Sequence, residues 1–443
     1  MRFARCLSLL AATGLLMAAA PFEPPKAGKR ILYRHATLID GTGAPARADM
    51  AVVTDGERIA AVVPDRDLKS DHLQGVEEVD LTGRFLLPGF IDTHVHLATQ
   101  PNRPQAEAQL RRLIYSGVTA VRDMAGDVRS LADLSRAARV GEIAAPDVHY
   151  VALMAGPSFF TDPRTAASAQ GEIPGKVPWM QSIDGQTDLK TAVALARGTS
   201  ASAIKVYANL PGPVVAAITA EAHRQNIPVW AHGMVFPATP NEVIAAGVDV
   251  ASHTCYLGYQ AMDRRPPTYQ QRSDFPVDAS LFRSDNPATS ALFGEMKRRG
   301  TILDATIYVY QIAEKRERQA GRVPFCTEAL AIRLTNHAYR SGVRISTGTD
   351  GDTPAGNPWP SLFGEFALLG GPVGMKPEDV IQATTKNGAA AAGQGSEMGT
   401  VEAGKLANLV VLSADPLKSV DNMKSVVLTV KRGRRYPRAD FKP

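Results

Sequence analysis

Between residues 86 and 349 the sequence alternates short apolar segments with segments of helical periodicity, and this alternation is the feature that most restricts the fold. Apolar runs of about five to seven residues separated by helical stretches are typical of βα units and a parallel sheet. The predicted strands are 86–96, 120–123, 149–153, 203–207, 229–232, 250–253, 302–307 and 344–349. Helical patterns between them include 105–116, 189–198, 214–225, 292–299 and 328–341. About eight strand–helix repeats predict an α/β fold of the TIM-barrel type, with its chemistry at the carboxyl ends of the strands.

The two ends of the chain have a different texture. Residues 31–87 and the segment after residue 408 are rich in Val, Ile and Thr, in short alternating runs separated by turn residues. This pattern predicts antiparallel strands. We therefore expect a small β-sandwich domain built from both termini, residues 21–87 plus 396–443, around a TIM-barrel catalytic domain of residues 88–395. The Pro- and Gly-rich stretch 156–187 is expected to be an insert on the active face and a candidate lid.

The first twenty residues predict an export signal. A basic start, which contains Arg2 and Arg5, precedes an apolar stretch that ends in small residues. The apolar stretch is too short for a membrane span, so it is typical of a secretory signal peptide. We expect residues 1–20 to be removed, with cleavage near Ala19 or Ala20. The mature protein is then periplasmic or secreted, without a stable membrane anchor.

The charge excludes a dedicated nucleic-acid-binding protein. The formal net charge is +5, and removal of Arg2 and Arg5 would reduce it to about +3, which is too weak and too dispersed for that role. The one basic cluster, Lys431, Arg432, Arg434 and Arg435, is expected to be a solvated face. We expect a small-molecule substrate, and the oligomeric state is left open. Cys255 and Cys326 remain after export; they could pair in an oxidising compartment, but both are expected to be free.

Metal-ligand residue types recur where the predicted strands end. His94 and His96 lie two residues apart, so both imidazoles point to one face of a strand. Imidazole nitrogen is a common ligand for zinc and related ions. Chance placement does not plausibly explain all the residues at equivalent strand ends, which are His94, His96, Lys205, His232, His253 and Asp350.

These features resemble the amidohydrolase superfamily. The resemblance rests on "LLPGFIDTHVHL" (86–97), on "STGTD" (346–350), on the tail "TKNGAAAAGQGSEMGTVEAGKLANLVVL" (385–412), and on the placement of Lys205, His232 and His253. It is strongest with the subgroup whose two metal ions are bridged by a carboxylated lysine, as in prolidase-like and Xaa-Arg-type dipeptidases and dihydroorotase or hydantoinase relatives.

The resemblance implies a set of ligands for two divalent ions, with zinc favoured. It implies that His94, His96 and Asp350 hold the more buried ion and that His232 and His253 hold the more exposed one. Lys205, carboxylated by carbon dioxide, would bridge both, because a carbamate is an anionic oxygen ligand that can span two cations. A hydroxide shared by the ions would attack a carbonyl, and Asp350 would move its proton to the leaving amine.

Hydrolysis is favoured over deamination by an absence. The resemblance implies that an enzyme of the deaminase branch would have a mononuclear site, with a glutamate shortly after the histidine of strand 5. Here His232 is followed by Gly233, Met234 and Val235. We expect an exported hydrolase of amide bonds in dipeptides or N-acyl amino acids. An ester or lactone hydrolase with the same site is the alternative. A non-catalytic binding protein is disfavoured because no ligand is missing.

Three residues are expected to contact the substrate. Tyr207 lies two residues after Lys205 on the same strand face, so its hydroxyl is predicted to orient the substrate or its oxyanion. Tyr256, after strand 6, is a weaker candidate for substrate binding. Arg164, in the insert, is a candidate for capture of a substrate carboxylate.

Overall fold

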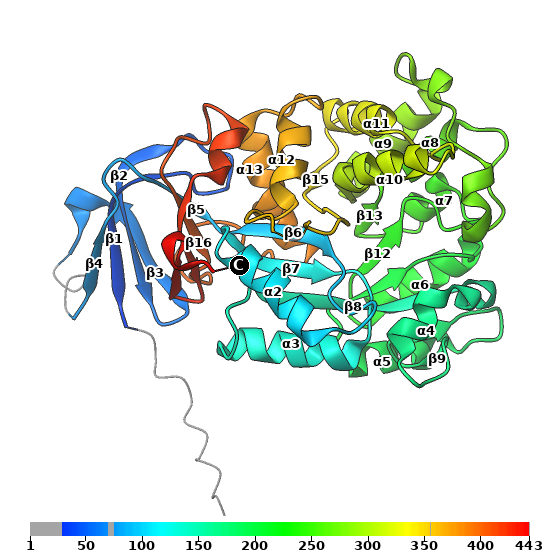
Figure 1. Ribbon diagram of the computed structural model, residues 1–443, viewed down its shortest axis with the longest axis horizontal. Helices are drawn as coiled ribbons and strands as arrows, with labels where there is room; N and C mark the ends of the chain where they lie inside the picture. Colours follow the sequence, from blue (N-terminus) through cyan, green and yellow to red (C-terminus); the bar gives the residue numbers. More distant parts are fainter. Residues whose placement is uncertain (1–28, 70–74, 355, 443) are drawn as a thin grey trace, which may run out of the picture.

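The computed structural model describes residues 29–69, 75–354 and 356–442, and it consists of a barrel beside a smaller sheet (Figure 1). The first and last strands of the chain form the sheet, and the central part of the chain forms the barrel. The predicted signal peptide, 1–20, lies outside the described residues. Among the described residues, none of the helices has both the length and the apolar character needed to cross a bilayer.

The predicted α/β barrel is confirmed. Seven successive strand pairs are parallel, from β6 to β15. The barrel nearly closes where Thr93 N donates to Thr347 O at 2.8 Å and Asp350 N donates to His94 O at 2.9 Å. The barrel strands are β6 (Phe90–Val95), β7 (Val118–Asp123), β8 (Asp147–Ala155), β11 (Ala203–Val206), β12 (Val229–His232), β13 (Val250–Ser252), β14 (Ile302–Asp304) and β15 (Ile345–Ser346).

The first predicted strand, 86–96, is two strands in two different sheets. β5 (Phe85–Pro88) belongs to the terminal sheet, and β6 belongs to the barrel. The chain crosses between them at Gly89, where a Cβ atom would lie 2.2 Å from the Thr119 side chain. Glycine therefore permits the crossing. His94 stays on β6, and His96 follows its last residue.

Helices alternate with the strands around the barrel, as predicted. Side-chain caps begin several of them: Asp127, Asp188 and Thr327, for example, each accept a hydrogen bond from a backbone N–H of the first turn, which satisfies donors that a helix end leaves free. The helices are α2 (Arg103–Ile114), α3 (Val128–Val140), α4 (Pro163–Ala169), α5 (Leu189–Gly198), α6 (Gly212–Arg224), α7 (Pro240–Ala245), α8 (Thr254–Gly258), α9 (Pro287–Arg299), α10 (Ile307–Gln319), α11 (Glu328–Arg340), α12 (Leu362–Gly370), α13 (Pro377–Thr384) and α14 (Lys386–Ala391).

The predicted strand 302–307 is too long by three residues, because α10 begins at Ile307. The buried Glu365 carboxylate accepts hydrogen bonds from the backbone N–H groups of Ile307 and Tyr308 at 3.1 and 2.7 Å. These bonds satisfy two of the N–H groups that the start of a helix leaves free. This capping residue is far away in the sequence, so local patterns give no sign of it.

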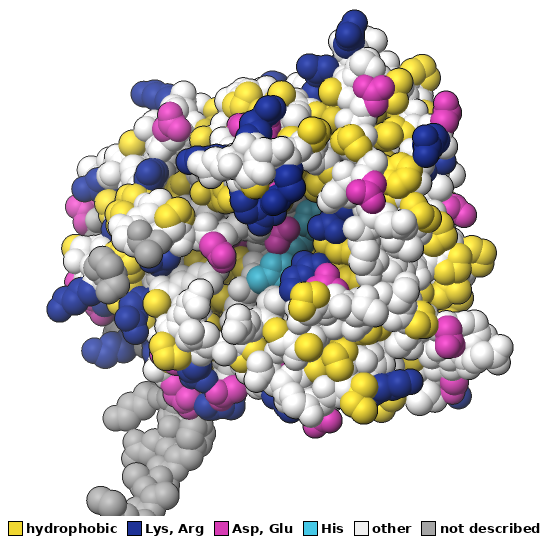
Figure 2. All heavy atoms as spheres, turned by 45° about the vertical axis from the view of Figure 1, so that its right-hand side comes forward, with side chains coloured by type: hydrophobic (Ala, Val, Ile, Leu, Met, Phe, Trp, Pro, Cys, Tyr) yellow, Lys and Arg dark blue, Asp and Glu magenta, His cyan; other side chains and the backbone are white. Residues whose placement is uncertain are grey.

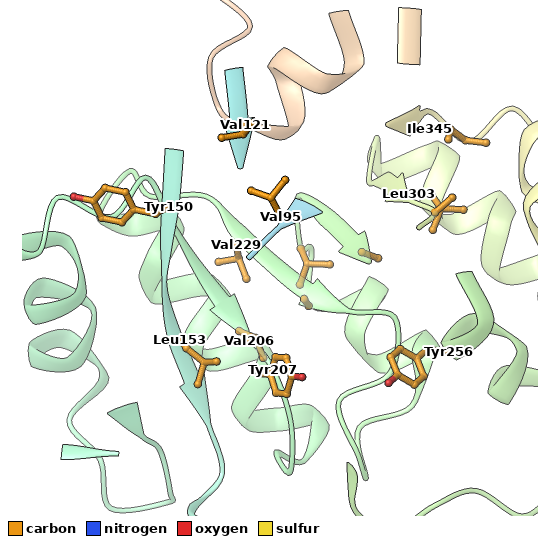
Figure 3. Close-up of a cluster of buried hydrophobic side chains, with 14 of the residues drawn as sticks. Val95, Val121, Tyr150, Leu153, Val206, Tyr207, Val229, Tyr256, Leu303 and Ile345 are labelled. Carbon is orange, nitrogen blue, oxygen red and sulfur yellow. The ribbon is translucent and has the colours of Figure 1, made fainter. Parts of the chain in front are cut away.

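Apolar side chains on the outer face of the barrel strands pack against the surrounding helices. Figure 3 shows Val95, Val121, Val206 and Leu303, which come from β6, β7, β11 and β14, and all four are buried in this layer. Their removal from water is the main favourable contribution to folding. This packing holds the carboxyl ends of the strands in fixed positions, and the candidate functional residues lie at these ends.

The terminal strands form one mixed eight-stranded sheet, with strand order β18-β17-β16-β5-β1-β2-β3 and β4 beside β1. The union of the two termini is thus confirmed: β5 pairs in parallel with β1 and antiparallel with β16. The sheet strands are β1 (Ile31–Leu38), β2 (Arg47–Asp55), β3 (Arg58–Pro64), β4 (Glu77–Asp80), β16 (Leu409–Leu412), β17 (Val426–Lys431) and β18 (Arg434–Pro437).

The basic cluster near the C-terminus is a solvated face only in part: Arg434 and Arg435 are exposed, but Lys431 and Arg432 are not. Lys431 is buried, and its Nζ donates to Ala138 O at 2.6 Å and lies 3.2 Å from an Asp147 carboxylate oxygen. Arg432 pairs with the same carboxylate at 2.9 Å and with Glu57 at 2.8 Å. Asp147 begins β8, so these cations join the terminal sheet to the barrel. A buried cation needs such a partner.

The expectation of free cysteines is also wrong. Cys255 and Cys326 form a disulfide with a Cα–Cα distance of 6.2 Å, within the usual range for such bridges. Cys255 lies in α8, directly after β13, and Cys326 precedes α11. The two sites are 71 residues apart, and only the fold brings them together.

Loss of this disulfide is expected to lower the free energy of unfolding by about 3 kcal/mol, because the bridge closes a long loop in the unfolded chain. The measurement is urea denaturation with and without dithiothreitol. The matched control is Cys255→Ser/Cys326→Ser, whose unfolding midpoint should not respond to the reductant. Equal midpoints for the wild type in both conditions would contradict this expectation.

Candidate metal centre and substrate cavity

All six predicted ligand residues line one cavity of about 260 Å³ at the carboxyl ends of the barrel strands. Figure 2 shows histidine side chains at the bottom of a hollow in the surface, with Lys or Arg and acidic side chains around them. The six residues are His94, His96, Lys205, His232, His253 and Asp350. The structure therefore brings together donors that are spread over more than half of the chain.

His94, His96 and Asp350 form the tightest group. Their ligand atoms lie within 4.8 Å of one another, close enough to hold one metal ion. Asp350 Oδ1 is 3.2 Å from His96 Nε2 and 3.7 Å from His94 Nε2. The His94 and His96 pair comes from β6 and its end, and Asp350 follows β15, the neighbouring strand at the barrel closure.

His232 and His253 form the other half of the site. His232 ends β12, and His253 follows β13 in a left-handed conformation with φ of 73°. The ring centroids of His232 and His253 are 4.8 Å apart, and those of His253 and His94 are also 4.8 Å apart. His253 thus belongs with His232 and also lies beside His94 of the first group.

Lys205 is buried in the middle of β11, on the cavity side. Its Nζ donates to Met124 O at 2.8 Å and lies 4.7 Å from the ring centre of Tyr207. Burial lowers the pKa of Lys205 to about 7. A substantial fraction of the amine is then neutral near neutral pH, and a neutral amine is the form that reacts with carbon dioxide.

Burial keeps the three enclosed histidines neutral. It lowers the pKa of His253 to about 3, with a further contribution from His94, and it lowers the pKa values of His232 and His94 as well. Asp350 shows the opposite balance: burial raises its pKa, but the neighbouring histidines, His94 foremost, hold it well below its ordinary value. Neutral imidazoles and an ionised carboxylate are the protonation states that metal coordination requires.

A second layer of buried groups orients His94. The His94 Nδ1 atom is 2.8 Å from Asp304 Oδ2, and Arg122 Nη2 donates to the same oxygen at 3.1 Å. Such a carboxylate–histidine contact fixes the ring and leaves Nε2 directed at the site. Burial raises the pKa of Asp304, but the hydrogen bond from His94 and the Arg122 charge outweigh it, so the pKa falls to about 2. Our sequence analysis missed Asp304, because the predicted strand 302–307 placed it inside the strand and not at its end.

The residues present fit metal ions. His94 Nε2 and His232 Nδ1 are both buried and have no hydrogen-bond partner among the described residues. Buried polar atoms are nearly always satisfied, so these two nitrogens indicate absent ligands. Because His94 and His232 belong to the two halves of the site, each half offers one free donor atom.

The residues predicted to contact substrate also line the cavity. Tyr207, Tyr256 and Arg164 all lie on its wall, and Tyr207 stacks near His232 with ring centroids 4.1 Å apart. The Tyr207 hydroxyl donates to Tyr269 Oη at 3.1 Å, and Arg164 Nη2 donates to the same oxygen at 3.3 Å. Their contacts with a substrate remain predictions.

Several lining residues escaped the sequence analysis. Two of them lie in the long connection after β13, two lie in α10, and one lies between α10 and α11. In an irregular connection, no periodic pattern predicts which side chains point into a cavity. These residues are Tyr269, Arg272, Tyr310, Arg316 and Phe325.

Tyr207→Phe is expected to lower kcat about tenfold without loss of metal, since it removes one hydrogen-bonding hydroxyl beside His232. Steady-state kinetics together with metal analysis tests this. Tyr150→Phe is the control, because that hydroxyl donates to Thr199 O at 3.1 Å, outside the cavity lining. Unchanged kcat in Tyr207→Phe would remove the hydroxyl from the catalytic machinery.

Comparison with known proteins agrees with this geometry. Residues 85–436 match the model of the "Amidohydrolase family". The chain is 24% identical over 405 residues to an imidazolonepropionase of Agrobacterium fabrum, covering 86% of this chain and 89% of that protein.

The fold is also similar to solved structures. A Xaa-Pro dipeptidase with bound methionine superposes with a TM-score of 0.69 at 21% identity, over 92% of this chain and 100% of that one. The ochratoxinase of A. niger superposes with a TM-score of 0.71 at 21% identity, over 93% and 96%. Both similarities extend over nearly the whole chain.

Proposed function

From the premise that this chain belongs to the amidohydrolase family, we propose that it is a binuclear metal-dependent hydrolase that cleaves the amide bond of dipeptides or N-acyl amino acids. The single observation that carries the proposal is the convergence of four histidines, one lysine and one aspartate on one cavity. The family is one of metal-dependent hydrolases, and the cavity holds the donors for that chemistry.

The proposal gives each donor a place. His94, His96 and Asp350 would hold one ion, His232 and His253 the other, and Lys205, as a carbamate, both. The ions, most simply zinc with this mixture of nitrogen and oxygen donors, would polarise the scissile carbonyl and lower the pKa of the attacking water.

The remaining steps belong to side chains of this chain. The Asp350 carboxylate is ionised, so it can accept the proton of the attacking water and deliver it to the leaving amine. Tyr207 and Tyr256 stand on the cavity wall, where their hydroxyls can orient the carbonyl of the substrate.

The similar solved structures support an amide substrate over other classes. One is described as a Xaa-Pro dipeptidase and another as a prolidase complexed with N-methylphosphonate-L-proline, at 21% identity each. The bond cleaved by this chain is assigned by analogy with those proteins and with its own donor set.

The test is activity of the metal-loaded enzyme on a panel of dipeptides, N-acyl amino acids, esters and lactones. The proposal expects release of free amino acid from members of the first two groups. Turnover of esters or lactones alone would replace amide by ester hydrolysis. No turnover of any member, with two ions bound per chain, would favour a binding protein.

We also propose that the protein is exported. The Cys255–Cys326 disulfide supports this, because structural disulfides persist in oxidising compartments such as the periplasm. Cell fractionation with mass determination of the mature N-terminus tests it, and recovery of an unprocessed protein in the cytoplasmic fraction would contradict it.

A further inference from the structure

One cation that lines the cavity has no acidic partner. Arg272 lies in the 3₁₀ helix Tyr269–Asp274, within the connection after β13. Its Nη1 donates to Tyr269 O at 2.9 Å, but its Nε is buried and has no hydrogen-bond partner among the described residues. Across residues 29–69, 75–354 and 356–442, no carboxylate comes within ion-pair distance of it.

The other two arginines of the cavity differ in this respect. Arg164 forms a two-point pair with Asp162, with distances of 3.0 and 2.7 Å. Arg316 lies 3.3 Å from Glu317, and its side chain is largely exposed. An unpaired, partly buried guanidinium is costly. Arg272 is therefore the arginine of the cavity whose charge would be balanced by an external anion.

Aromatic rings fix the Arg272 guanidinium in place. Its central carbon lies 3.9 Å from the ring centre of Tyr269 and 6.0 Å from that of Phe325. Tyr269 is anchored in turn, since its N–H donates to Asn209 Oδ1 at 2.8 Å. Phe325 precedes the disulfide-bonded Cys326 and stacks on Tyr256 at 5.6 Å. A guanidinium held in one plane loses little freedom when it binds a planar anion.

The shape of the free donor group selects the anion. A guanidinium presents paired N–H groups that match a carboxylate in a two-point contact. Asp350 is the only carboxylate among the described lining residues of this cavity, so an incoming carboxylate meets little repulsion near Arg272. The walls beside it are the rings of Tyr256, Tyr310 and Phe325, which favour an apolar or aromatic side chain.

The geometry points to Arg272 as the receptor of the substrate carboxylate, and thus to N-acyl amino acids or dipeptides with a free carboxylate and a large apolar or aromatic side chain. This inference rests on the proposed function for its chemistry, but it makes a separate claim about binding. Arg272 determines specificity, and it takes no part in the proton transfers.

The test compares each free acid with its carboxamide, for example N-acetylphenylalanine and N-acetylphenylalaninamide, as acyl donors. For wild type, kcat/KM is expected to be about 100-fold higher for the acid, as a charge-assisted two-point contact provides. In Arg272→Gln the acid should lose about 100-fold while the carboxamide changes by less than about threefold. Arg272→Lys should recover part of the loss. A structural defect would lower both substrates alike, and that result, or an unaltered preference, would overturn the inference.

Arg264→Gln is the matched control, an exposed arginine of the same connection outside the cavity lining, and it should keep the wild-type preference. If the wild type hydrolyses neither compound, the proposed function fails, and binding decides the inference. Calorimetry with 3-phenylpropionate and 3-phenylpropionamide then asks whether wild type prefers the acid and whether Arg272→Gln abolishes that preference. Absence of any preference in wild type would refute the role of Arg272 independently of catalysis.

Discussion

Under the proposed function, replacement of Lys205 by alanine is expected to remove most of the metal and to lower kcat/KM by at least about 10⁴-fold, because both ions would lose their shared anionic ligand. The structure places the Lys205 amine in the one cavity that also holds the four histidines and Asp350. Without a bridge, two cations at close range would repel each other. Metal analysis of the purified variant beside wild type measures the first effect, and steady-state kinetics measures the second.

Lys431→Ala separates this effect from the general cost of removing a buried lysine. Lys431 is also buried, but it joins β17 to Ala138 and Asp147 and is not part of the cavity lining. This variant should lose stability and keep its metal. Full metal retention in Lys205→Ala would refute the bridge, whatever the activity.

The bridge also predicts a dependence on pH and carbon dioxide during reconstitution of the metal-free protein. The pKa of the Lys205 amine is lowered by burial to about 7, so the reactive neutral form dominates above that pH. Below it the neutral fraction falls about tenfold per pH unit. Recovery of activity with zinc should therefore need added bicarbonate and should decline between about pH 7 and pH 6. Recovery that is independent of bicarbonate would indicate an uncarboxylated lysine.

The barrel and the convergence of the candidate ligands could be predicted from sequence because both follow from local periodicity. Strands of a parallel barrel are buried on both sides and read as apolar runs, and their carboxyl ends meet at one face. His232, His253 and Asp350 each come at or just after such a run. Finding the runs was therefore enough to find the six candidate ligands, but not the other residues of the cavity.

The misjudged features depend on contacts between distant segments. Cys255 and Cys326 are joined only because the connection after β13 folds back against the segment before α11. Arg272 has no periodic signal, and it enters the cavity because Tyr269 N–H is held by Asn209, sixty residues earlier. Lys431 belongs to a basic run that the sequence predicts to be exposed, but in the fold its Nζ lies beside the Asp147 carboxylate. Sequence patterns report burial along one element, and they do not report which distant element covers it.

Asp350→Asn is expected to lower kcat by about 10³-fold on an amide substrate, the range of a positioned acid–base group. Its carboxylate lies 3.2 Å from His96 Nε2 and 3.9 Å from His253 Nδ1, so it touches both halves of the site. Asparagine keeps the size and an oxygen but cannot carry a proton between water and amine. Asp352→Asn, an exposed neighbour, is the matched control and should retain activity.

Metal content and leaving groups distinguish the two roles of Asp350, ligand and proton carrier. If it carries the proton, the variant should be impaired most on alkyl amides, whose amine must be protonated before it leaves. A nitrophenyl ester releases a stable nitrophenolate anion that needs no proton. The rate of its hydrolysis should therefore fall at least about tenfold less than that of an alkyl amide. If Asp350 acts only as a ligand, both substrates should fall together, in proportion to the metal lost. An equal decline at full metal occupancy would assign the proton transfer to a group other than Asp350.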